Sequence, residues 1–179
     1  MPYTPIHCSI AYLSRAIRPQ ISLPALIVST MAPDLEIPFL YFITEGQQSR
    51  LVLHSLLGAA TLATLLSMFL TVCVYSSVVS RLFRIDYSVI KNRCRFSWSM
   101  IVFCLIGSLS HVLIDSTHHE YNPMLFPFSL NSFDALVFMN DWAQASVIIP
   151  LAFFSLLVFF IVLEVRKGTK DIWKRLLVG

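Results

Sequence analysis

Charged residues are scarce in this sequence. Asp, Glu, Lys and Arg make up 13% of its 179 residues, about half of the roughly 25% that soluble domains carry. Cysteine is also rare, and the four cysteines have no CxxC spacing, so neither a thiolate metal site nor a disulfide framework is indicated. The N-terminus lacks the basic start of a secretory signal, and we expect it to be retained.

Hydrophobic residues make up 56% of the chain, and the mean hydropathy is +0.73. A helix needs about 20 apolar residues to cross a bilayer. Four segments approach or exceed that length: residues 21–43, 52–80, 99–117 and 143–165. We therefore predict an all-α fold, a multispanning membrane helix bundle of about four apolar segments plus a short N-terminal helix. We expect a single membrane domain over residues 1–179 and no nucleic-acid partner.

The first apolar segment contains a proline and an aspartate near its middle. Pro33 lacks a backbone N–H and disrupts a helix, so we predict a break near Met31–Asp34. Such a break can direct a carboxylate into a protein interior. The alternative is that Asp34, which follows a proline, begins a helix as its N-cap.

Lys and Arg are concentrated in two parts of the chain. Ten of the thirteen lie in residues 81–98 or in the tail after residue 165, whereas residues 118–142 contain none. The positive-inside rule places the first two parts in the cytoplasm and the third outside. We therefore expect a multi-pass protein of the cytoplasmic membrane whose C-terminus is cytoplasmic.

The third apolar segment ends in four ionisable side chains. In a helix, with His111 at zero, Asp115 projects at about +40°, His118 at about −20° and His119 at about +80°. One face thus presents two imidazoles and a carboxylate. Gly107, one turn before His111, would let a neighbouring helix approach closely. This pattern is typical of half a metal site.

The predicted topology places further candidates in the same outer layer. His54 begins the second apolar segment, and Asp34 lies in the outer half of the first. His7 is expected near the inner side unless the N-terminal helix returns through the membrane, and the sequence leaves both placements open.

Imidazole and carboxylate ligands suit zinc, with manganese or iron as alternatives. We expect a divalent metal ion and predict these ligands: His7, Asp34, His54, His111, Asp115 and His118. Asp34 and Asp115 are the candidate catalytic carboxylates, which would bridge the metal or accept a proton. The alternative for the histidines is a role in capping, helix packing or contact with lipid headgroups.

Three nearby residues have less defined roles. We expect His119 and Glu36 to support a ligand or to be solvated. Arg50 would form a surface pair with Glu45 or attract an anionic substrate.

At these residues the chain resembles the YdjM-like family of membrane proteins, which are predicted metal-dependent hydrolases, and related uncharacterised membrane proteins. Residues 1 to about 130 carry the resemblance. Its motifs are Met1–His7 (MPYTPIH), Pro33–Asp34, His54–Leu57 (HSLL) and Ser110–Asp115 (SHVLID). The resemblance implies a helical membrane fold that binds a metal.

The chain also departs from the family pattern. Many YdjM-like proteins have a His-Arg-Gly-x-Thr-His-Ser run, of which residues 49–55 keep the arginine and second histidine but lack the first histidine and the glycine. His118 or His119 could supply the missing imidazole. The order His7, Asp34, His54, His111-x3-Asp115 is also similar to that of zinc-dependent phospholipase C and related nucleases, although their later His-x3-Glu is missing here.

We predict a membrane-embedded hydrolase in which a metal-bound water, its pKa lowered toward 7, attacks a phosphoester or acyl bond. A lipid-like substrate is expected because the site lies at the outer interface. The alternatives are a metal-ion or proton transporter and a non-catalytic protein stapled by a metal. A transporter should have ionisable groups continuing inward, whereas residues 62–80 and 99–106 offer only Ser, Thr, Cys and Tyr as polar groups.

Overall fold

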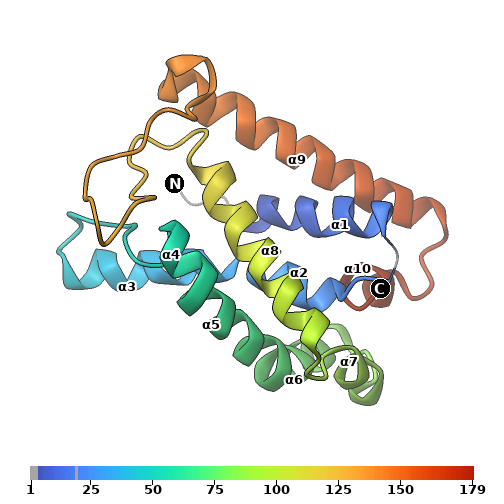
Figure 1. The fold of residues 1–179 in the computed structure, drawn as a ribbon. Helices are drawn as coiled ribbons and strands as arrows, with labels where there is room; N and C mark the ends of the chain where they lie inside the picture. Colours follow the sequence, from blue (N-terminus) through green and yellow to red (C-terminus); the bar gives the residue numbers. More distant parts are fainter. Residues whose placement is uncertain (1–3, 19) are drawn as a thin grey trace.

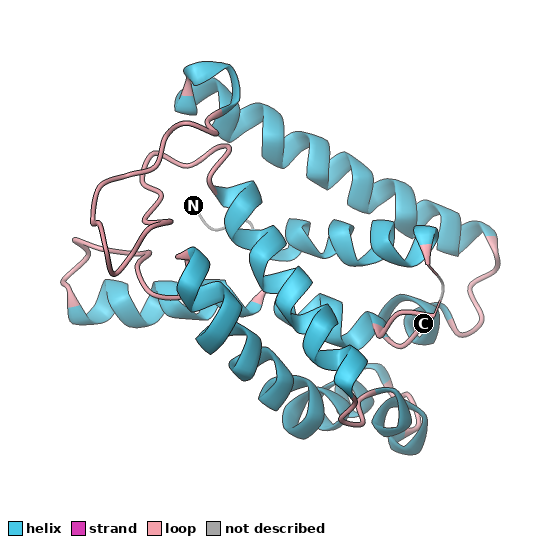
Figure 2. Ribbon diagram, viewed as in Figure 1, coloured by secondary structure: helices cyan, strands magenta, loops and turns pink. Residues whose placement is uncertain are grey.

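The computed structural model describes residues 4–18 and 20–179. Helix makes up 68% of the structure, and the described residues form no strand, which confirms the all-α prediction (Figure 2). The α-helices are α1 (Cys8–Ile17), α2 (Leu23–Ser29), α3 (Glu36–Ile43), α4 (Leu56–Gly58), α5 (Thr64–Phe69), α6 (Ser76–Phe83), α7 (Tyr87–Arg93), α8 (Trp98–Asp115), α9 (Trp142–Arg166) and α10 (Ile172–Leu177). The 3-10 helices are η1 (Thr4–His7), η2 (Ala32–Leu35) and η5 (Phe138–Asn140), and the π-helical turns are η3 (Ala59–Ala63) and η4 (Leu70–Tyr75).

Three helices are long and apolar enough to cross a membrane, and a bent pair forms a fourth candidate span. The first of the three runs unbroken over Leu56–Phe83, because the π-helical turns η3 and η4 join α4, α5 and α6. The others are α8 and α9, and α9 leaves nearly all of its apolar surface uncovered by protein. An apolar surface of this length is more stable in lipid than in water, which is consistent with a membrane protein.

The bent pair consists of α2 and the continuous helical segment Ala32–Ile43, with an angle of 42° between them. Pro33 lies in the first turn after the break and has no N–H to donate. The N–H of Asp34 bonds to the carbonyl of Met31 at 3.2 Å, a 3-10 contact, which leaves the Thr30 carbonyl available for another donor. The predicted break near Met31–Asp34 is therefore confirmed.

Helices α2 and α8 pack directly against each other at the centre of the bundle (Figure 1). Gly107 of α8 is the point of closest approach. A Cβ at this position would lie 1.9 Å from Ser29 Oγ and 2.8 Å from Ser29 Cβ. The prediction that Gly107 admits a neighbouring helix is confirmed, and that neighbour is the helix that leads to Asp34.

Helix α1 lies between α2 and α9 and ends beside α10 (Figure 1). The Tyr12 hydroxyl donates to the Leu176 carbonyl at 2.9 Å, and Arg15 Nη1 donates to the Arg175 carbonyl at 2.6 Å. The end of α6, helix α7 and helix α10 meet at this same end of the bundle, which carries most of the Lys and Arg. The start of α1, at His7, therefore lies toward the opposite end.

Candidate metal centre

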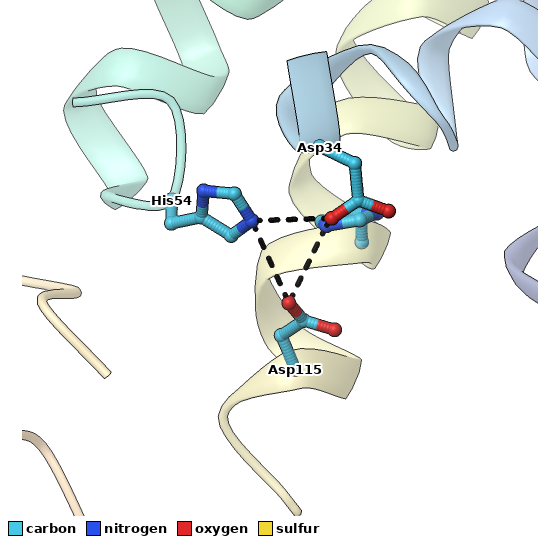
Figure 3. Close-up of side chains that lie close together, drawn as sticks. Asp34, His54 and Asp115 are labelled. Atoms are coloured by element: carbon cyan, nitrogen blue, oxygen red, sulfur yellow. Dashed lines mark ion pairs between the residues drawn. The ribbon is translucent and has the colours of Figure 1, made fainter. Parts of the chain in front are cut away.

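Four buried side chains converge where α2 gives way to η2 and where α8 ends (Figure 3). Asp34 comes from η2, His54 from the turn before α4, and His111 and Asp115 from α8. Their exposed fractions are 7%, 2%, 0% and 3%. Three separate segments of the chain thus bring two imidazoles and two carboxylates into one protected place.

The donor atoms of these four residues have the spacing of a metal coordination shell. His54 Nε2 lies 3.5 Å from Asp34 Oδ1 and 3.6 Å from Asp115 Oδ2. His111 Nε2 lies 3.5 Å from each of the same two oxygens. Ligands at about 2.0–2.1 Å from a zinc ion define tetrahedral edges of about 3.3–3.4 Å. The four atoms, all within 4.8 Å of one another, could hold a divalent ion after small movements.

His111 is held in the tautomer that a metal ligand requires. Its Nδ1–H donates to the Thr30 carbonyl at 2.8 Å, the carbonyl that the break after α2 leaves available. The proton on Nδ1 leaves the lone pair on Nε2, which is buried and has no hydrogen-bond partner among the described residues. The break that Pro33 introduces after α2 therefore also orients His111, a candidate metal ligand on α8.

His54 is oriented in the same way, but by a carboxylate. Its Nδ1 lies 3.0 Å from Glu36 Oε2, and Nε2 is buried without a hydrogen-bond partner in the part of the chain that the structure describes. Glu36 also accepts hydrogen bonds from the backbone N–H groups of Val52 and Leu53. Of the two roles expected for Glu36, the structure supports that of a group behind the ligand.

The turn that carries His54 is fixed at its other end by the start of α4. The Ser55 side chain caps this helix by accepting from the N–H of Gly58 at 2.9 Å. A Cβ on Gly58 would lie 1.8 Å from the Val52 carbonyl oxygen. The absence of a side chain at Gly58 therefore lets residues 52–55 fold over the first turn and place the imidazole.

A second group of imidazoles lies around the same aspartate. His7 Nε2 and His119 Nε2 lie 3.3 Å and 3.6 Å from Asp115 Oδ1. Donor atoms of Asp115, His118 and His119 also lie within 4.8 Å of one another. Helix α8 ends at Asp115, so the helical projection of His118 onto the face of His111 does not apply beyond that residue. His118 lies with this second group rather than in the four-residue cluster.

Burial keeps the imidazoles after α8 neutral. It lowers the pKa of His118 and lowers the pKa of His119 to about 3. The Nδ1–H of His118 donates to the Ile114 carbonyl at 2.9 Å, so the lone pair of this ring is on Nε2. Neutral imidazole is the form that binds metals.

Arg50 contacts the site directly. Its Nε donates to Asp115 Oδ2 at 3.3 Å, and its Nη2 donates to His119 Nε2 at 2.9 Å. The expected surface pair with Glu45 is not among the ion pairs of the described residues. Arg50 instead lies at the edge of the cluster, and its side chain is 12% exposed. At this position its guanidinium could contact an anionic substrate.

The family model described as Domain of unknown function (DUF4184) matches residues 1–175. The chain belongs to this family. No match was found among curated proteins or among solved structures. The structure therefore gives this DUF4184 member a candidate metal centre that its family description does not include.

The predicted ligands of this DUF4184 protein all lie in or beside the centre. Asp34, His54, His111 and Asp115 form the four-residue cluster, and His7 and His118 lie in the second group. His7 lies beside Asp115 because α1 starts here and runs toward the basic end. Of the two placements that the sequence leaves open for His7, the structure has the one beside the other candidate ligands. The family-like residues Met1–Tyr3 lie outside the described residues.

Two cavities flank the centre. The larger, about 510 Å³, is almost wholly apolar and reaches from Asp34 between α1, α2 and α6 to Leu177 near the basic end. The smaller, about 210 Å³, is lined by polar and apolar side chains alike, His119, Glu120 and Trp142 among them. An apolar cavity thus reaches Asp34 of the four-residue cluster, and a mixed one reaches His119 of the second group.

Proposed function

We propose that this protein is a membrane-embedded metal-dependent hydrolase that cleaves a phosphoester or acyl bond of a lipid-like substrate at the outer face of the cytoplasmic membrane. The proposed ion is zinc, with manganese or iron as alternatives. The observation that carries the proposal is the close spacing of four buried donor atoms, in which each imidazole nitrogen lies 3.5–3.6 Å from both carboxylate oxygens. The resemblance to YdjM-like predicted hydrolases supports the same chemistry.

The histidines and the aspartates of the cluster have different roles. His54 and His111 offer Nε2 lone pairs, because each Nδ1–H is held by an acceptor behind it. Asp34 and Asp115 each direct one oxygen to the ligand set, and Asp34 or Asp115 would accept the proton of the bound water. A divalent ion held there would lower the pKa of a bound water toward 7 and supply the nucleophile.

The larger cavity supports a lipid-like substrate. Its walls are apolar side chains such as Val28 and Val74, and Asp34 lies at one end. A hydrocarbon chain in this cavity would bury apolar surface while the bond to be cleaved lies at the metal. Arg50, on the other side of Asp115, could bind an anionic headgroup.

The distribution of charge supports an outer-face site. The basic end of the bundle holds α7, α10 and the end of α1, and the cluster lies toward the other end. The positive-inside rule places the basic end in the cytoplasm. A substrate in the outer leaflet would then reach the centre without leaving the bilayer.

Metal content tests the site itself. Wild type, His111→Ala and Asp115→Ala, purified in detergent, should differ: wild type retains at least one divalent ion per chain, and both variants lose it. Asp171→Asn is the matched control because Asp171 is exposed at the basic end. Metal content that both cluster variants share with wild type would remove the site.

Turnover separates the hydrolase from its alternatives. We expect product release from phospholipid vesicles or from a model phosphodiester, and its loss with a chelator and in Asp115→Ala. A closed structural site would bind metal without turnover. Ion flux in liposomes without product release would favour a transporter instead.

A further inference from the structure

The two oxygens of Asp115 have different neighbours. Oδ2 lies 3.6 Å from His54 Nε2 and 3.5 Å from His111 Nε2. Oδ1 lies 3.3 Å from His7 Nε2 and 3.6 Å from His119 Nε2. One carboxylate thus stands between two sets of imidazoles, and only one of these sets belongs to the four-residue cluster.

Around Asp115 Oδ1, two buried polar atoms have no hydrogen-bond partner among the described residues. Asp115 Oδ1 is buried and has no hydrogen-bond partner within residues 4–18 and 20–179, and the same holds for His7 Nδ1. His7 and His118 are 3% and 1% exposed. A polar group that is buried without a partner destabilises the fold, and a bound cation would give the carboxylate a partner.

We infer that Asp115 bridges two cation positions, and that the second position holds a divalent ion on Asp115, His118 and His119, whose donor atoms lie within 4.8 Å of one another. Two imidazoles and one carboxylate oxygen make a donor set suited to zinc or manganese, and His7, 3.3 Å from Asp115 Oδ1, would orient that carboxylate. Ions in two-metal sites lie about 3.5–4 Å apart, a separation that a shared carboxylate can span.

Arg50 competes with this second ion. Its guanidinium now donates to Asp115 Oδ2 and to His119 Nε2, and the latter bond uses the lone pair that a metal would need. A second ion on His119 therefore requires Arg50 to turn away. Removing the guanidinium should strengthen binding of the second ion, because it frees the lone pair on His119 Nε2.

This inference rests on the proposed function and narrows its substrate to phosphoesters. Two ions at this separation can stabilise both the attacking and the leaving oxygen of an in-line displacement at phosphorus. Arg50, once released from His119, could contact the remaining phosphate oxygens, for which a guanidinium is well matched. An acyl substrate would need only the first position.

Counting ions tests the inference without reference to activity. The purified full chain is stripped with a chelator, dialysed against Mn²⁺, and measured for bound manganese and for its electron paramagnetic resonance spectrum. We expect two Mn²⁺ per chain and a spin-coupled signal. His118→Ala and His119→Ala should each retain one Mn²⁺ with an uncoupled signal, and Arg50→Gln should lower the Kd of the second ion about tenfold.

The outcomes separate the two proposals. One uncoupled Mn²⁺ in wild type overturns the second position and leaves the first intact. Two Mn²⁺ in wild type and in both histidine variants overturns the assignment of His118 and His119. No bound ion in wild type, at an unfolding temperature that shows a folded protein, overturns this inference and the proposed function together.

Discussion

Glu36 Oε2 lies 3.0 Å from Nδ1 of His54. Glu36 is not one of the four candidate metal ligands, but its carboxylate fixes the imidazole of His54, which is one of them. The same carboxylate accepts from the N–H groups of Val52 and Leu53, and it therefore anchors the whole turn before α4. Glu36 is a positioning residue. Its removal should affect the metal more than the fold.

We predict that Glu36→Gln lowers metal affinity about 10–100-fold, the usual cost of losing a group behind a ligand. The amide can still fill the space, but it no longer favours a proton on Nδ1 of His54. Metal titration gives the affinity, and the visible spectrum of the Co²⁺-loaded protein reports ligand geometry. Glu45→Gln, at an exposed position, is the control. Equal affinities and equal spectra in both variants would contradict the positioning role.

The packing of α2 on α8 gives a second prediction. Gly107→Ala forces a Cβ into the 1.9 Å gap to Ser29 Oγ, so the two helices must separate. We expect a loss of about 1–3 kcal/mol in the free energy of unfolding and weaker metal binding, because α2 leads to Asp34 and carries the acceptor for His111. Thermal unfolding in detergent and metal titration measure the two effects.

A compensating change distinguishes this steric effect from a general loss of helix stability. Ser29→Gly removes both of the close side-chain atoms, so the double variant Ser29→Gly/Gly107→Ala should regain metal affinity. The glycine itself costs about 1 kcal/mol in a helix. A double variant that binds metal no better than Gly107→Ala would show that the close contact is not what matters.

The apolar spans and the break before Asp34 could be predicted because each depends on local sequence. Hydrophobic length identifies a span, and Pro33 lacks the donor that a continuous helix needs. His111 and Asp115 share a helical face because α8 is regular up to its last residue. His118 follows the end of that helix, so its position depends on the loop and could not be derived from a helical period.

The roles of Arg50 and Glu36 depend on contacts between distant segments. Arg50 reaches Asp115 across 65 positions of the sequence, and no local pattern specifies that pairing. Glu36 is close to Asp34 in sequence, but its partner is a turn 16 to 18 residues later. A carboxylate within an otherwise apolar segment was the one available signal that Glu36 has a buried partner.

The larger cavity yields a prediction about substrate length. Val74→Trp should fill part of the space along η4 and lower kcat/KM for long-chain lipids about tenfold. Hydrolysis of a small soluble phosphodiester should change little, because that substrate needs only the metal end. Val158→Trp, on the lipid-facing surface of α9 and outside the cavity lining, is the matched control. Equal losses for long and short substrates would contradict an acyl chain in this cavity.

The orientation in the membrane can be tested with cysteines at the two ends of the bundle. Asn131 is exposed in the loop between α8 and α9, and Lys170 is exposed before α10. Because basic segments stay in the cytoplasm, we expect a membrane-impermeant maleimide to label Asn131→Cys in intact cells and Lys170→Cys only after permeabilisation. The unlabelled control is wild type: Cys94 and Cys104 are buried, Cys8 is partly buried, and the exposed Cys73 lies within the candidate span Leu56–Phe83, where lipid would cover it. The reverse pattern would place the metal centre at the cytoplasmic face and exclude outer-leaflet lipids as its substrate.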